Sequence, residues 1–121
     1  MISLNYRDSR PIYEQIKEGF RNLLVTEAIA AGERLPSVRE LAAELAINPN
    51  TIQRAYRELE AEGYIYSVPG KGSFAADRKN IVEIRQRELL QIFDDTAAKL
   101  KELGMTAQAL KTRIDKEGER K

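Results

Sequence analysis

Five polar side chains stand at helical spacing near the start of segment 49–62. They are Asn50, Thr51, Gln53, Arg54 and Arg57. Asparagine and glutamine can pair with adenine through two hydrogen bonds, arginine with guanine or phosphate, and threonine with phosphate or the thymine methyl group. The N-terminus of a helix adds partial positive charge and N–H groups that favour a phosphate. We therefore expect these side chains to meet base edges in a major groove of DNA.

Charge is distributed unevenly along this segment. No acidic residue lies between Ala46 and Arg57, whereas Glu58, Glu60 and Glu62 all lie in the last turns. The first half of the segment is therefore locally positive, although the net charge of the whole chain is only +1. So small a net charge argues weakly against a nucleic-acid-binding protein, and the hypothesis depends on where the charges lie. The alternative is that Gln53, Arg54 and Arg57 are solvated surface.

Two other short motifs could support the same contact. Ser37 and Glu40 form a capping box that starts a helix, and Arg39 lies in its first turn, although it could pair with a nearby glutamate instead. The motif from Gly70 to Gly72 is either a plain hairpin tip or a turn whose glycines let the backbone approach DNA, with Lys71 on a phosphate or in the minor groove. The expected DNA-binding residues are Ser37, Arg39, Asn50, Thr51, Gln53, Arg54, Arg57, Gly70 and Lys71.

The segments around these residues predict three helices followed by a hairpin. Asn48 is a suitable N-cap and Pro49 a suitable first residue for the third helix, and Gly63 can end it. This order is typical of a winged helix-turn-helix, to which we assign residues 1–76. The expected elements are a helix from Pro11 to 27–29, a loop over 31–36, helices over 38–45 and 49–62, and strands over 64–68 and 73–75.

Tyr13 and Tyr56 occupy apolar positions of the first and third predicted helices. Aromatic residues at such spacing are usually part of the core. The alternative is that either hydroxyl, at the edge of the core, contacts a phosphate.

The remainder of the chain, residues 77–121, predicts two helices. The first should run from about Arg78 to Leu103 and end at Gly104, the second should be capped by Thr106, and the charged tail from Asp115 is expected to be frayed. These helices have too few residues for a large core of their own. We therefore expect a helical dimerisation tail, against the alternative of packing wholly within one chain. The expected dimerisation residues are Leu89, Phe93, Ala97, Leu100, Leu103 and Leu110.

Composition argues against an enzyme. The chain contains no cysteine and no histidine, and its carboxylates show no cluster, so we expect no cofactor and no metal site. It has no apolar run of about 18 residues and no signal-peptide pattern at its start, which favours a cytoplasmic protein. An unknown small-molecule effector stays open as a partner, although the tail has little room for its pocket except across a dimer interface.

Several motifs together resemble the GntR family of bacterial transcription regulators. The resemblance spans roughly residues 8–76 and includes segments 11–16, 32–42, 48–60, 63–65 and 70–74. It implies a homodimer on a palindromic operator, with DNA contacts from Arg39, Asn50, Thr51, Gln53, Arg54 and Gly70. Some members of the family have a basic residue where this chain has Pro49, and arginine where it has Gln53. The base preference of this chain should therefore differ from that of those members. The short tail resembles the YtrA subfamily, in which it serves dimerisation.

The sequence therefore predicts a mostly α-helical chain with a small β-wing that acts as a sequence-specific transcription regulator, most simply a repressor. The alternative is a winged-helix module that binds proteins. The polar tip formed by Asn50, Thr51 and Gln53 favours DNA, because a protein interface would present aromatic anchors there.

Overall fold

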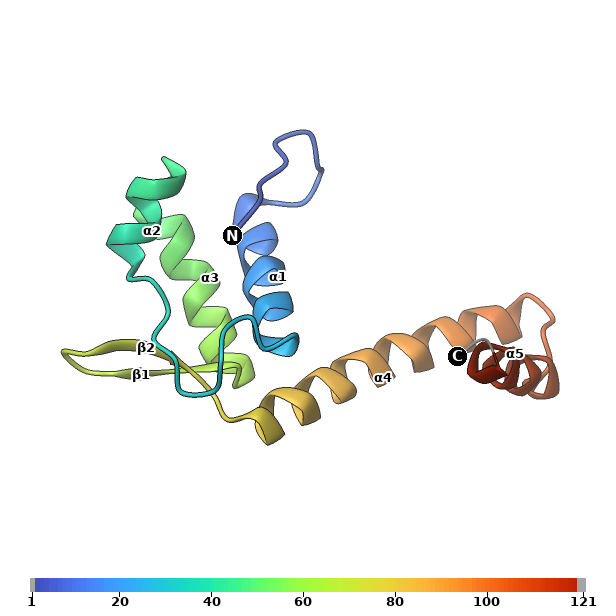
Figure 1. The fold of residues 1–121 in the computed structure, drawn as a ribbon. Helices are drawn as coiled ribbons and strands as arrows, with labels where there is room; N and C mark the ends of the chain where they lie inside the picture. Colours follow the sequence, from blue (N-terminus) through green and yellow to red (C-terminus); the bar gives the residue numbers. More distant parts are fainter. Residues whose placement is uncertain (1, 120–121) are drawn as a thin grey trace. The chain divides into compact units, whose positions relative to one another are not determined.

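The computed structural model describes residues 2–119, and it forms three helices, a hairpin and two further helices in that order (Figure 1). This is the mostly helical fold with a small two-stranded sheet that the sequence predicts. The elements are α1 (Ile12–Val25), α2 (Val38–Leu45), α3 (Pro49–Glu62), β1 (Ile65–Val68), β2 (Gly72–Ala75), α4 (Arg78–Glu102) and α5 (Ala107–Glu119).

The chain divides into two compact units between Arg85 and Gln86, here called the N-terminal unit and the C-terminal unit. The sequence had suggested a boundary after residue 76. The first turns of α4 belong to the N-terminal unit because Ile81 is buried in its core and Ile84 packs on Gly63. A Cβ atom at Gly63 would lie 2.9 Å from Ile84 Cδ1, so glycine both ends α3 and makes room for α4.

The core of the N-terminal unit forms where α3 packs between α1 and α2 (Figure 1). Phe20 and Tyr56 meet edge to face across α1 and α3, with their ring centroids 5.4 Å apart. Tyr56 is 4% exposed, and its hydroxyl donates a hydrogen bond of 2.6 Å to the carbonyl of Pro36. Burial raises the pKa of this hydroxyl well above its usual range. The expectation that Tyr56 belongs to the core is therefore confirmed.

Helix boundaries follow the local signals closely. Asn48 Oδ1 accepts from the N–H of Asn50 at 2.8 Å, Pro49 is the first helical residue, and Gly63 ends α3 in a left-handed conformation, as predicted. Pro11 precedes the first residue of α1 instead of being that residue. The helix α1 also ends at Val25, two to four residues earlier than expected, and Glu27 follows with a φ of 65°.

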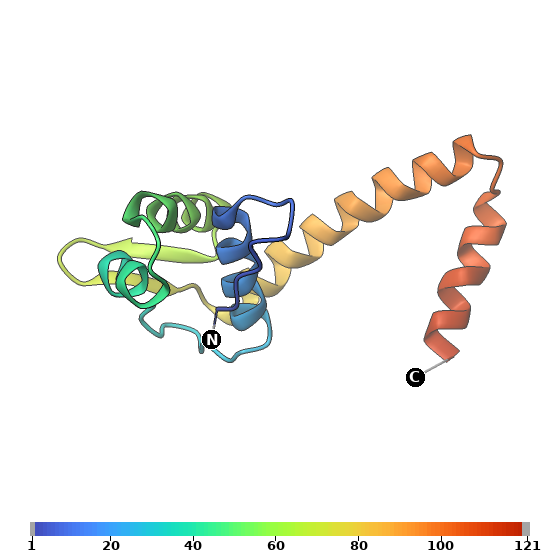
Figure 2. The ribbon, with the colours of Figure 1, turned by 90° about the horizontal axis from the view of Figure 1, so that it is seen from above.

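The hairpin pairs β1 with β2 in antiparallel register, and its turn projects from the helical body on the side of α2 in both views (Figures 1 and 2). The segment before α2, which the sequence predicted as a loop, pairs with the outer edge of β2. The N–H groups of Gly32 and Leu35 donate to the carbonyls of Ala75 and Ser73 at 2.9 and 2.8 Å. The N–H of Ala75 donates to Glu33 at 2.9 Å. This pairing fixes the hairpin, here called the wing, to the start of α2.

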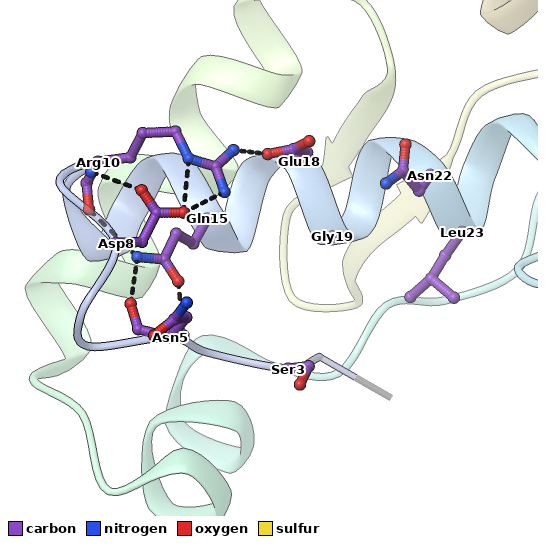
Figure 3. A pocket seen from close by; sticks show the side chains of 9 residues that line it. All are labelled: Ser3, Asn5, Asp8, Arg10, Gln15, Glu18, Gly19, Asn22 and Leu23. Atoms are coloured by element: carbon purple, nitrogen blue, oxygen red, sulfur yellow. Dashed lines mark hydrogen bonds and ion pairs between the residues drawn. The ribbon is translucent and has the colours of Figure 1, made fainter.

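The buried amide of Gln15 anchors the segment before α1 (Figure 3). Its Oε1 accepts from the N–H of Asn5 at 2.8 Å, and its Nε2 donates to the carbonyls of Asn5 and Arg10 at 2.9 and 3.2 Å. A polar cavity lies between this segment and α1, and Figure 3 shows that Asp8 and Glu18 on its rim both face Arg10. The buried polar group that lines this cavity, the amide of Gln15, is thus already hydrogen-bonded within the chain.

The C-terminal unit consists of the rest of α4 and of α5. Gly104 follows α4 with a φ of 99°, and Thr106 Oγ1 accepts from the N–H of Ala109 at 3.1 Å. The helix α5 continues to Glu119, so the expected fraying from Asp115 is not seen there, and residues 120–121 lie outside the described part. None of the helices within residues 2–119 combines the length and apolar character needed to cross a membrane.

Candidate nucleic-acid interface

The tight turn between α2 and α3 sets the direction in which α3 leaves the body. Ala46 takes a left-handed conformation with a φ of 55°, which ends α2. The N–H of Ile47 then donates to the carbonyl of Ala42 at 3.0 Å, and Asn48 caps the next helix. Ile47 is half-buried and holds the turn against the core. The N-terminal residues of α3 therefore follow α2 after only three residues, which is the helix-turn-helix arrangement.

Most of the predicted reading residues on α3 are exposed to solvent. Asn50, Gln53, Arg54 and Arg57 are exposed, and Thr51 is half-buried. Asn48 acts as the cap, which leaves its side-chain oxygen committed to the backbone of α3. The exposed surface of the first turns of α3 therefore offers amide and guanidinium groups, which recognise base edges and phosphates. None of residues 49–57 carries a carboxylate, and Glu58 in the following turn reaches Arg54.

Each glutamate in the last turns of α3 has a partner within the N-terminal unit. Lys17 on α1 donates to Glu58 Oε1 at 3.0 Å and also to Glu62. Ser67 on β1 donates to Glu60 Oε1 at 2.7 Å. The hydrogen bond from Lys17 lowers the pKa of Glu58 below its usual range. Ion pairing with Lys17 offsets part of the negative charge of Glu58 and Glu62, whereas the hydroxyl of Ser67 bonds Glu60 without offsetting its charge.

Arg54 is held between α1 and α3. Its Cζ lies 3.7 Å from the centroid of the Tyr13 ring, and its Nε donates to Glu58 Oε2 at 3.2 Å. Its side chain nevertheless remains 57% exposed. Tyr13 is half-buried and packs against the core, as its spacing predicts. The structure adds that its ring also lies under a predicted reading residue. No local pattern could indicate this contact, because 41 positions separate the two residues.

The start of α2 presents one predicted contact residue and uses another for its own cap. Ser37 Oγ accepts from the N–H of Glu40 at 3.0 Å, which confirms the predicted N-cap. Arg39 follows on the exposed surface of the first turn. The hydroxyl of Ser37 is therefore structural in the free protein, and Arg39 is the cation that the first turn of α2 offers, next to the exposed carboxylate of Glu40.

The two glycines of the wing turn differ in their surroundings. Gly70 has a φ of 74°, and a Cβ atom there would meet nothing within 4 Å, so the backbone is open to close approach. Gly72 has a φ of 117°, and a Cβ atom there would lie 2.9 Å from Arg34 Nε. Gly72 therefore makes room for an arginine of the same chain.

Arg34 is a residue that the sequence reasoning missed. Its Nε donates to the carbonyl of Lys71 at 3.1 Å, and its Nη2 lies 3.8 Å from Glu40 Oε1. These contacts bring the wing turn and the start of α2 together, and leave the side chain of Lys71 exposed. The one available signal was an arginine in the loop just before a capped helix, which does not reveal its partner.

In the C-terminal unit, the predicted dimerisation stripe divides into two parts. Ala97, Leu100 and Leu110 are half-buried, and with Phe93 they line an apolar groove between α4 and α5. Leu89, Phe93 and Leu103 are exposed, as are apolar residues outside the predicted set, among them Leu90 and Ile92. The α4–α5 pair thus covers part of the stripe and leaves Leu89, Leu90 and Phe93 around a second open groove.

Comparison with known proteins places this geometry in context. The model of the family described as bacterial regulatory proteins, gntR family, matches residues 12–74. The chain is 37% identical over 106 residues to an uncharacterised HTH-type transcriptional regulator, YhcF, of Bacillus subtilis, which covers 87% of this chain and 88% of that protein. It is 44% identical over 77 residues to the transcriptional repressor YtrA of the same organism, which covers 64% of this chain and 59% of that protein.

Two solved structures are also similar. A GntR family transcriptional regulator from Listeria monocytogenes aligns with a TM-score of 0.73 at 37% identity, over 90% of this chain and 96% of that one. The DNA-binding domain of AraR, solved in complex with an operator, aligns with a TM-score of 0.55 at 30% identity, over 61% of this chain and 89% of that one. The first likeness extends over both units, and the second is to a protein bound to DNA.

Proposed function

Because the chain belongs to the GntR family of DNA-binding transcription regulators, we propose that it is a repressor that binds a palindromic operator as a homodimer. The observation that carries the proposal is the exposed, acid-free start of α3 behind a helix-turn-helix turn. Arg39, Gly70 and Lys71 flank it as phosphate or minor-groove contacts. Support for a repressor comes from YtrA, whose name describes it as one.

The exposed apolar residues of the C-terminal unit support the homodimer. Leu89, Leu90, Ile92 and Phe93 are each about half exposed or more along two turns of α4. Contiguous apolar surface of this kind is typical of protein interaction sites. A second copy would cover it with the same residues across a two-fold axis, and a two-fold axis is also what a palindromic operator requires. Two copies of α3 would then enter major grooves one helical turn apart, about 34 Å.

Operator binding is tested with a fluorescently labelled duplex from the region upstream of the protein's own operon. We expect Gln53→Ala/Arg54→Ala to weaken binding at least tenfold, because each two-bond base contact contributes about 1–3 kcal/mol of discrimination. The matched control is Gln108→Ala/Lys111→Ala, which removes the same kinds of group from exposed positions on α5. Wild-type affinity should fall steeply with salt, because phosphate contacts release counterions. Full affinity in the α3 variant would contradict the assigned reading surface.

The dimer is tested by Leu89→Glu/Phe93→Glu, which places two charges on the apolar part of α4. We expect the variant to be a monomer by light scattering and to bind the palindromic duplex more weakly. The monomer should still bind a single half-site with the same sequence preference. Ala109→Glu adds a charge at an exposed position of α5 and should leave the dimer intact. A stable dimer in the α4 variant would show that this surface is not the interface.

A further inference from the structure

The guanidinium of Arg54 is fixed from two sides, and both supports depend on α1. The ring of Tyr13, in the first turn of α1, lies 3.7 Å from Arg54 Cζ. Glu58 accepts from Arg54 Nε at 3.2 Å and is itself held by Lys17 of α1 at 3.0 Å. An arginine side chain is otherwise among the most mobile in a protein. The arrangement therefore restricts Arg54 before any ligand is bound.

The ring of Tyr13, not its hydroxyl, makes this contact. The hydroxyl lies 3.2 Å from Glu14 Oε1 on its own helix, whereas the face of the ring lies against the guanidinium. A cation on an aromatic face is attracted by the quadrupole of the ring, and stacking leaves the edge of the guanidinium accessible. This agrees with the 57% exposure of the Arg54 side chain.

We propose that Tyr13 is a positioning residue for operator recognition, whose ring presents the guanidinium of Arg54 in the orientation that base pairing requires. The inference rests on the proposed function. Two-bond recognition of guanine needs a planar donor pair held at one angle, and a pre-ordered group loses less rotamer freedom when it binds. Tyr13 thereby influences sequence preference without touching a base.

The test uses the full-length chain and the same labelled duplex, with Tyr13→Phe, Tyr13→Leu, Arg54→Ala and the double variant Tyr13→Leu/Arg54→Ala. We expect Tyr13→Phe to bind as the wild type does, because the aromatic face is kept. Tyr13→Leu should weaken binding about fivefold, in the range of one exposed cation–π contact. That loss should disappear in the Arg54→Ala background. Tyr6→Leu, at a tyrosine that is 72% exposed, is the matched control.

A second measurement separates positioning from a general effect on folding. The NMR signal of Arg54 Nε–H should shift and broaden in Tyr13→Leu but not in Tyr13→Phe, while the melting temperatures stay close to that of the wild type. Equal losses of binding in Tyr13→Phe and Tyr13→Leu would assign the role to the hydroxyl and overturn the proposal. A loss that persists in the Arg54→Ala background would also overturn it. A wild-type chain that binds no duplex from its operon would refute the proposed function and this proposal with it.

Discussion

Gly72→Ala is expected to destabilise the N-terminal unit more than Gly70→Ala does, although both glycines lie in the same turn with positive φ. A side chain in the left-handed region costs about 1–2 kcal/mol, which applies to Gly70 with its φ of 74°. The strain is no smaller at Gly72, because its φ of 117° lies further from the region that L residues adopt. Only at Gly72 does the added Cβ also meet a neighbour, since it would lie 2.9 Å from Arg34 Nε. Arg34 can move aside because its side chain is flexible, but it then loses its hydrogen bond to Lys71.

The additional cost at Gly72 is that of one hydrogen bond from a charged donor in an exposed setting. A net contribution of about 0.5–1.5 kcal/mol is appropriate for such a bond. We therefore expect Gly70→Ala to lower the free energy of unfolding by about 1–2 kcal/mol and Gly72→Ala by about 2–3 kcal/mol. A difference of about 1 kcal/mol corresponds to roughly 4–8 °C in melting temperature for a unit of this size.

The assay is urea unfolding followed by circular dichroism, repeated in the Arg34→Ala background. Without the arginine side chain, the alanine at position 72 meets no guanidinium, and the difference in stability between the two glycine variants should shrink by about 1 kcal/mol. If the difference in stability between Gly72→Ala and Gly70→Ala were unchanged in the Arg34→Ala background, backbone strain alone would explain that difference, and the role assigned to Arg34 would be wrong.

Three further perturbations test single contacts of the N-terminal unit. Ser37→Ala removes the cap of α2 and should lower the free energy of unfolding by about 1 kcal/mol, whereas Ser37→Asp should retain it in urea unfolding. Tyr56→Phe leaves the carbonyl of Pro36 without its donor and should cost about 1–3 kcal/mol in the same assay. The pKa of Glu58 is lowered by Lys17, so the pair contributes fully to stability above the carboxyl's usual pKa of 4.5, and this contribution is lost as pH falls from there through the lower pKa of the folded state. When the free energy of unfolding is measured from pH 6 to pH 3, Lys17→Met should lack the part of the pH dependence that comes from this pair. An identical pH profile in that variant would contradict the assignment.

The start of α3 was predictable from sequence because its signals act within one turn. A side-chain oxygen at Asn48, a proline at position 49 and a glycine at position 63 each fix backbone geometry locally, and the structure has all three as expected. The wing was predictable for the same reason, since its turn requires positive φ at Gly70. Unequal charge along α3 also follows from sequence order alone.

Pairings between distant residues could be decided only by packing. The segment before α2 is a loop, as the sequence predicts, but its hydrogen bonds to the edge of β2 could not be predicted, because only the folded chain brings residues 32–35 beside that strand. Likewise, only packing shows that the first turns of α4 belong to the N-terminal unit, because Ile81 and Ile84 pack with a core formed by other elements.

The proposed reading surface on α3 depends on both kinds of information. The residue types on α3 and their polarity are properties of the sequence, and they were enough to indicate DNA. Which of those side chains is held in place is a property of the tertiary structure, because the ring of Tyr13 reaches Arg54 only when α1 packs against α3. Arg34 reaches Lys71 for the same reason. Local capping and periodicity extend over a few residues, whereas contacts across 37 to 41 positions depend on how the helices and the wing pack together.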